Sequence, residues 1–202
     1  IASNTSYASG SAKAPLIVVE SGSALYIRDG TILEYNSNKP NTNSNGTTFT
    51  ESGYIGLGGA VYCRGDLTMD GGTIRYCEAL CGGGIYIESS SSNWITFNLS
   101  GGTITYNYAR DIVPIPSSGH RSYHKNAGGG AYVGDYVTMN MSGGTVSYNQ
   151  SSREGGGISL GWLNRNNGSA ISSYITYFNM TGGTFTKNIA TSTGGALNIT
   201  AG

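Results

Sequence analysis

One sequence block recurs along the chain, and its spacing constrains the fold more than any other feature. Each block has a glycine-rich strand, a short loop, a second strand, and a Gly-Gly-Thr triplet that opens a third strand. The triplets begin at Gly71, Gly101, Gly143 and Gly182, and an earlier Asp-Gly-Thr begins at Asp29. Their starts are 42, 30, 42 and 39 residues apart. Such a period is typical of solenoids, because one unit alone cannot bury its apolar face.

The residues inside each block predict short strands. Apolar and polar residues alternate with a period of two, as in Phe97 to Leu99 and Val137 to Met141. The chain also contains 33 Gly and many Ser, Thr and Asn residues, which are weak helix formers. The shortest repeat leaves about ten residues for each strand and its turn, which gives three strands in each repeat.

We therefore expect an all-β chain, folded as a right-handed single-stranded parallel β-helix with five to six rungs of three short strands. A single domain spans 1–202, with a cap or linker at 1–15. The segment Ile32 to Asn36 is one residue longer than its counterparts, which predicts a bulge or a misaligned first block. The expected rungs are 16–36, 58–77, 82–107, 128–149, 155–188 and 194–200, and the expected insertions are 37–57, 110–127 and 161–174.

Asparagine closes the third strand in most rungs, at Asn36, Asn107, Asn149 and Asn188. Amides stacked at one corner can hydrogen-bond along the column and pair with turn backbone groups. Cys77 takes this place in the second rung, so we expect it to interrupt the ladder and to be buried. The three cysteines, Cys63, Cys77 and Cys81, cannot all pair with one another; Cys77 and Cys81 can pair across a turn, or all three are free and buried.

Two columns of tyrosine follow from the same alignment. The first column, Tyr62, Tyr86 and Tyr132, is expected to point outward and stack. A second column lies beside the asparagine ladder, at Tyr35, Tyr76, Tyr106 and Tyr148. Exposed rings can contact sugars, and the alternative is that tyrosine pairs with itself across strands.

Two expected insertions carry further ligand-binding candidates. The second holds His120, Tyr123 and His124, and the third holds Trp162, Asn164 and Arg165. His-x-x-x-His binds zinc on a helix, but prolines in this segment favour a loop, and a solvated loop is the alternative interpretation. No two carboxylates form a recognisable catalytic pair, so we assign no catalytic residue, no metal ligand and no cofactor, and enzymatic activity stays open. The carboxylates considered are Glu34, Asp70, Glu78, Glu88, Asp111, Asp135 and Glu154.

The charge pattern limits the partners. Eleven basic and eleven acidic residues give a formal net charge of zero, with no basic run, which argues against nucleic acid. No apolar stretch approaches the roughly 20 residues of a membrane-spanning helix. The chain begins with Ile1 and carries no signal peptide, so we interpret it as a segment of a longer polypeptide with further domains. Low charge with abundant Thr, Asn, Tyr and Gly favours a secreted or cell-surface protein.

The blocks resemble the repeats of pectate-lyase-like β-helix modules in bacterial surface proteins. The alternation of Gly82-Gly83-Gly84-Ile85 with Thr-x-x-Asn motifs is similar to that of polymorphic-membrane-protein-type adhesins. The resemblance covers residues 16–200 and implies a fold more specifically than an activity, because this scaffold hosts adhesins, lyases and glycoside hydrolases alike.

We expect a non-catalytic module that binds glycans or a host surface through exposed aromatic and loop residues. The alternatives are a glycoside hydrolase or polysaccharide lyase, or a fragment of one, and a structural spacer.

Overall fold

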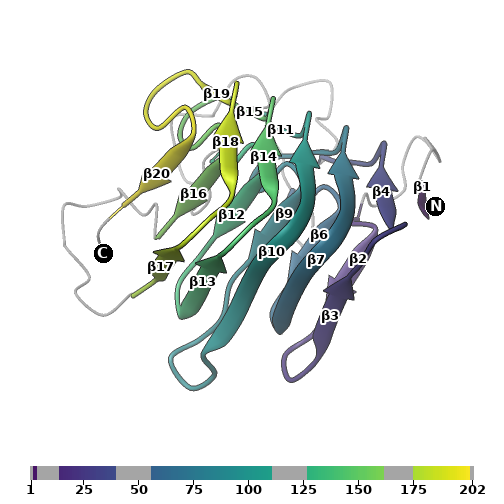
Figure 1. Cartoon of the computed structure of the whole chain (residues 1–202), viewed down its shortest axis with the longest axis vertical. Helices are drawn as coiled ribbons and strands as arrows, with labels where there is room; N and C mark the ends of the chain where they lie inside the picture. Colours follow the sequence, from purple (N-terminus) through teal and green to yellow (C-terminus); the bar gives the residue numbers. More distant parts are fainter. Residues whose placement is uncertain (1, 4–13, 40–55, 111–126, 162–174, 201–202) are drawn as a thin grey trace, which may run out of the picture.

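The computed structural model describes residues 2–3, 14–39, 56–110, 127–161 and 175–200. Within these ranges every regular element is a β-strand, and the strands form three parallel sheets (Figure 1). The predicted all-β class is confirmed. The described part of the chain contains no helix that is long and apolar enough to cross a membrane.

Spatial order in the sheets follows chain order. The first sheet contains β2 (Ile17–Val19), β6 (Val61–Cys63), β9 (Ile85–Ile87), β12 (Ala131–Val133), β16 (Ile158–Leu160) and β20 (Leu197–Ile199). The third sheet contains β5 (Ser37–Asn38), β8 (Glu78–Ala79), β11 (Tyr108–Ala109), β15 (Gln150–Ser151) and β19 (Ile189–Ala190).

The second sheet has nine strands, because some of its strands cover only half of a neighbour. Its long strands are β7 (Asp66–Arg75) and β10 (Ile95–Thr105), and the shorter ones pair with parts of these or with one another. The shorter strands are β1 (Ala2–Ser3), β3 (Ala24–Ile27), β4 (Ile32–Glu34), β13 (Val137–Met141), β14 (Thr145–Ser147), β17 (Tyr177–Met180) and β18 (Thr184–Thr186).

The chain visits the three sheets in a fixed order. We call each stretch that gives strands to the first, second and third sheets in turn a pass. The second pass is β6, β7 and β8, the third is β9, β10 and β11, and β20 begins a sixth. Every strand pair in the three sheets is parallel, with the same position of neighbouring passes aligned, for example Leu67 with Phe97 and Phe97 with Met139.

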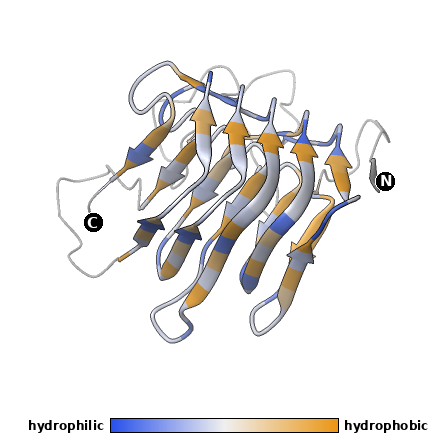
Figure 2. Cartoon of the chain, viewed as in Figure 1, coloured by the Kyte–Doolittle hydropathy of each residue, from blue (hydrophilic) through white to orange (hydrophobic). Residues whose placement is uncertain are grey.

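The core lies between the sheets. We call a row of side chains at the same register position on neighbouring strands a file, and the core is built from inward-facing files. Ile74, Ile104 and Val146 are each fully buried and occupy one file on neighbouring strands. Apolar bands run across adjacent strands in the same way (Figure 2). Burying one such side chain contributes roughly 1.5–3 kcal/mol, so the aligned files stabilise the stack of passes.

Glycines before the first strand of every pass after the first permit this close stacking. A Cβ atom placed on Gly129 would lie 2.3 Å from the carbonyl oxygen of Gly156 in the next pass. Any side chain would therefore separate the passes and weaken the parallel pairing.

Both parts of the expectation for the first block apply: its letters align one position off, and its turn holds one extra residue, because residues 28–31 lie between pairs that residues 70–72 separate on β7. Ile32 pairs with Thr73 and Leu33 pairs with Ile74, so the buried file continues through Leu33. The motif Asp29-Gly30-Thr31 resembles Gly-Gly-Thr in letters, but its threonine lies one position earlier in the turn.

Candidate functional site

The first tyrosine column is stacked, but it is buried. The ring centroids of Tyr62 and Tyr86 are 5.6 Å apart, and those of Tyr86 and Tyr132 are 5.0 Å apart. The three rings pack with Cys81 and Ala127 in a small hydrophobic cluster that is separate from the main core. The expected exposure is therefore wrong at these three positions, because an outward residue of a sheet is exposed only when nothing packs over it.

The hydroxyl groups of this column have defined acceptors. Tyr62 and Tyr86 donate to the two carboxylate oxygens of Glu88, at 3.2 and 2.6 Å. Tyr132 donates to the carbonyl oxygen of Gly161 at 2.9 Å. Burial, with the charge of Glu88 as a smaller cause, raises the pKa of Tyr86 well above its usual value, so this phenol stays protonated.

Asp135 lies beside Glu88, and one carboxylate oxygen of Asp135 has no hydrogen-bond partner among the described residues. The Asp135 side chain is nearly buried, and the oxygen without a partner is Oδ1. Burial, followed by the like charge of Glu88, raises the pKa of Asp135 to about 6. The structure thus brings together two carboxyl groups that sequence spacing did not pair.

An aromatic cluster flanks this carboxyl pair. Trp94 stacks on Tyr177 at 5.5 Å and meets Tyr136 edge-on at 5.6 Å. Trp94 and Tyr177 are exposed. Residues Gly161 and Ile175, which bound the segment containing Trp162, bond to Val133 and Tyr136 beside the same cluster.

The second tyrosine column is exposed along its whole length. The centroid separations are 5.0 Å for Tyr35 and Tyr76, 5.3 Å for Tyr76 and Tyr106, and 4.8 Å for Tyr106 and Tyr148. The four side chains are 39–52% exposed. We call this set the exposed tyrosine column.

The exposed tyrosine column has an unusual backbone. All four residues have φ between +52° and +55°, and Lys187, the next residue of the column, has φ of +53°. Such left-handed conformations are rare for large side chains and carry strain. The Lys187 ammonium group donates to the Tyr148 hydroxyl at 3.0 Å, which closes the column with a positive charge.

The geometry limits how a ligand can contact this column. Each inner ring has both faces covered by its neighbours, so its free parts are the edge and the hydroxyl group. A sugar therefore cannot stack on the inner rings, whereas hydroxyl groups repeated at about the spacing of neighbouring strands can hydrogen-bond to a linear polymer.

Polar files cover the outer face of the adjacent second sheet. The Asn179 amide donates to Asn140, and the Asn140 amide donates to Asn98, both at 2.9 Å. Threonine forms a second file, at Thr73, Thr103, Thr145 and Thr184. Both files run in the same direction as the exposed tyrosine column, from pass to pass.

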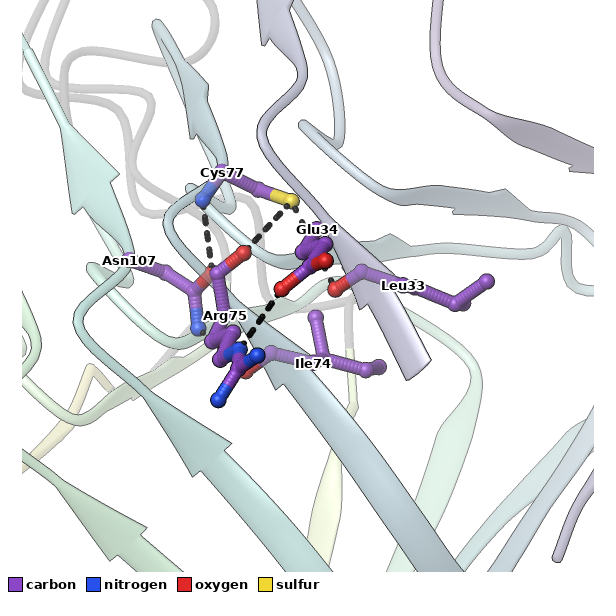
Figure 3. A network of polar contacts seen from close by, with 6 residues as sticks. All are labelled: Leu33, Glu34, Ile74, Arg75, Cys77 and Asn107. Atoms are coloured by element: carbon purple, nitrogen blue, oxygen red, sulfur yellow. Dashed lines mark hydrogen bonds and ion pairs between the residues drawn. The ribbon is translucent and has the colours of Figure 1, made fainter. Parts of the chain in front are cut away.

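The asparagine ladder lies behind the column and is structural. The backbone N–H and the side-chain amide of Asn107 both donate to Asn149 Oδ1, and those of Asn149 donate to Asn188 Oδ1. Cys77 interrupts the series: its N–H donates to Asn107 Oδ1, and its thiol reaches the carbonyl oxygen of Arg75 at 3.3 Å (Figure 3). Asn36 bonds instead to the carbonyl oxygens of Ala14 and Gly59.

All three cysteines are free and buried. Burial raises the pKa of the Cys63 thiol to about 11 and that of Cys77 to about 12, and it raises the pKa of Cys81 further. Such thiols stay protonated and are poor nucleophiles.

Most other carboxylates considered from the sequence lie in ordinary contacts. Glu34 pairs with Arg75, Asp70 pairs with Arg28, and Glu78 lies between Lys39 and Arg110. Glu154 accepts a hydrogen bond from Asn198 at 3.4 Å. In the part of the chain that the structure describes, no three His, Cys, Asp or Glu side chains form a metal-binding group.

Six ligand-binding candidates lie outside the described residues: His120, Tyr123, His124, Trp162, Asn164 and Arg165. Asp111 also lies outside them. Sequence spacing did not pair Glu88 with Asp135, because the two residues follow the aligned strands β9 and β12 at different offsets: Glu88 comes directly after Ile87, and Asp135 comes two residues after Val133.

The described residues define an all-β chain built on three parallel sheets, with an exposed tyrosine column and a separate carboxyl pair, in which Asp135 is buried and Glu88 is half-buried. No protein-family model matches the chain, and neither the curated proteins nor the solved structures contain a match.

Proposed function

We propose that this chain is a right-handed parallel β-helix module of a bacterial cell-surface or secreted protein, and that it binds a linear carbohydrate without catalysing a reaction. The fixed order of the three sheets in every pass supports the helical winding. The right hand follows because connections between parallel strands of one sheet almost always have that hand. The low charge content, 11%, and the repeat pattern support the extracellular location.

The observation that carries the binding proposal is the exposed tyrosine column. Four strained backbone positions keep large exposed rings where glycine or asparagine would relieve the strain. Strain of this kind is retained at functional sites more often than elsewhere. The buried first column leaves the second as the longer exposed aromatic strip in the described part of the chain.

The occupied ring faces define the kind of ligand. A polysaccharide chain that runs along the column presents hydroxyl groups at a regular repeat, and the phenol hydroxyls meet them as donors and acceptors. Tyr76, Tyr106 and Tyr148 each directly follow a second-sheet strand that carries a threonine of the polar file, so further hydroxyl groups are available for hydrogen bonds. In this binding mode the tyrosine hydroxyl groups contact the sugar, and the stacked rings hold those groups in place. In the ordinary mode the ring face itself stacks on the sugar.

A glycan array with a matched pair of variants tests the proposal. The double substitution Tyr76→Phe with Tyr106→Phe keeps the ring stack and removes two hydroxyl groups, so we expect binding to fall about tenfold or more. Tyr26→Phe serves as the control, because Tyr26 is exposed on β3 of the second sheet, outside the column.

Three results would count against the proposal. An array without any bound glycan would favour a structural spacer. If the double variant at Tyr76 and Tyr106 binds as tightly as the Tyr26→Phe control, the site lies elsewhere on the chain. Cleavage of a bound glycan would replace the binding module with a glycoside hydrolase or lyase.

A further inference from the structure

A second site lies away from the exposed tyrosine column, where a buried carboxyl group has an oxygen without a hydrogen-bond partner. The Asp135 side chain is 5% exposed, and no described residue donates a hydrogen bond to its Oδ1 atom. A buried, unpaired carboxylate is costly, because it loses water and gains nothing in return. Native proteins seldom leave such a group without a binding partner.

The neighbour of Asp135 increases the need for a positive charge. Glu88 lies close enough to affect the ionisation of Asp135, and it accepts hydrogen bonds from Tyr62 and Tyr86. None of the ion pairs in the described residues involves Glu88 or Asp135, and Arg64, one pass before Glu88, is exposed.

The backbone holds the two carboxyl groups in place. Ser89 N–H donates to the carbonyl oxygen of Asp135 at 3.1 Å, which joins the two passes at this point. Tyr136, next to Asp135, has φ of +56°; its N–H donates to the carbonyl oxygen of Ile175, and its carbonyl oxygen accepts from the N–H of Ile95. Strained positions that are fixed on both sides are characteristic of ligand clamps.

The residue before Asp135 leaves room for this arrangement. A Cβ atom on Gly134 would lie 3.0 Å from the Cβ atom of Glu88 and 3.3 Å from the Tyr132 ring. Glycine at position 134 therefore lets the Glu88 side chain lie between the two passes, toward the column of hydroxyl groups.

We propose that Asp135 and Glu88 bind a hard divalent cation of the calcium type. Hard cations take oxygen ligands, and neutral oxygens from hydroxyl groups, backbone carbonyls and water complete a coordination shell that two carboxylates begin. A carboxylate that already accepts two hydroxyl hydrogen bonds retains lone pairs for a metal ion. This site is independent of the carbohydrate proposal.

Calcium titration of the whole chain tests the site. We expect a dissociation constant in the millimolar range. A CaCl₂ concentration roughly ten times that constant then raises the Tm of the wild-type chain by about 3–6 °C at pH 8. Asp135→Asn abolishes the shift and has a higher Tm than the wild type without calcium, because a neutral amide replaces a buried charge. Glu88→Gln weakens the shift.

Asp70→Asn is the matched control, because it removes an exposed carboxylate paired with Arg28. It retains the full calcium shift. Terbium provides a second measurement, since nearby tyrosine and tryptophan rings sensitise its emission, and Asp135→Asn removes that emission.

Two outcomes would overturn the proposal. Without a calcium shift or terbium emission in the wild type, the carboxyl pair binds only a proton. With equal shifts in the wild type and Asp135→Asn, the cation binds elsewhere.

Discussion

At the scale of single residues, the exposed tyrosine column sets ring stacking against backbone strain. Left-handed backbone costs a non-glycine residue roughly 1–2 kcal/mol. A stacked aromatic pair contributes about 0.5–1.5 kcal/mol beyond its buried area. Tyr106 makes two such contacts, with Tyr76 and Tyr148, so stacking and strain nearly cancel at this position.

This balance predicts an inverted order for two small substitutions at position 106. Tyr106→Ala loses both stacking contacts and keeps the strain, whereas Tyr106→Gly loses the contacts and relieves the strain. We expect Tyr106→Gly to be more stable than Tyr106→Ala by about 1 kcal/mol, measured by urea unfolding.

The same pair of substitutions at Thr105 is the control. Thr105 lies in β10 with an ordinary strand backbone, so alanine is the more stable of the two there. If alanine also proves more stable at position 106, the left-handed backbone carries no strain of this size.

At the scale of elements, the asparagine ladder and the glycine-rich strands depend on each other. A Cβ atom on Gly84 would lie 3.2 Å from the Asn107 side chain, and one on Gly130 would lie 3.0 Å from that of Asn149. In the second pass both partners differ: Ala60 replaces the glycine, and Cys77 replaces the asparagine. A smaller ladder residue thus accompanies a larger residue opposite it.

This pairing predicts strong coupling between positions 60 and 77. Cys77→Asn alone places its amide near the carbonyl oxygen of Leu33, now 4.0 Å from the thiol, but crowds the Ala60 methyl group. Ala60→Gly alone loses buried contacts. The double variant restores the ladder. We therefore expect its free energy of unfolding to be about 1–2 kcal/mol higher than the sum of the two single effects gives.

A double-mutant cycle from urea unfolding measures this coupling. Ala131→Gly combined with Cys77→Asn is the control, because Ala131 belongs to a different pass and faces the main core. Additive effects for Ala60 and Cys77 would show that the two positions are independent.

The sequence predicts those features of the fold that recur in every repeat. The strands, the parallel pairing and the asparagine positions recur at matching places, so the sequence alone indicates them. Exposure was wrong for Tyr86 because alternation gives the side of a sheet, and Cys81 and Ala127 pack over that side. Glu88 and Asp135 follow the aligned ends of β9 and β12, so the repeat brings them close, but the repeat does not reveal that a buried oxygen of Asp135 is left without a hydrogen-bond partner.

At the scale of the whole molecule, stability depends on contacts between neighbouring passes. Interior passes are covered on both sides, as the full burial of Ile87, Leu99 and Val133 indicates. The last described strands keep the inward register but stay accessible: Met180 and Ile199 are exposed, although their aligned partners Met141 and Leu160 are buried. The final pass therefore gains less from burial than the interior passes do.

This gradient predicts the order of local opening. Each pass interacts mainly with its neighbours, so opening begins where only one neighbour is present and proceeds inward. We expect amide hydrogens in β19 and β20 to exchange faster than those in β9 and β12, although all four strands are hydrogen-bonded to a neighbour. Native-state hydrogen exchange with mass spectrometry measures the difference. Equal protection across the four strands would mean that the chain opens only as a single unit, because a stack with nearest-neighbour coupling opens first at its less covered end.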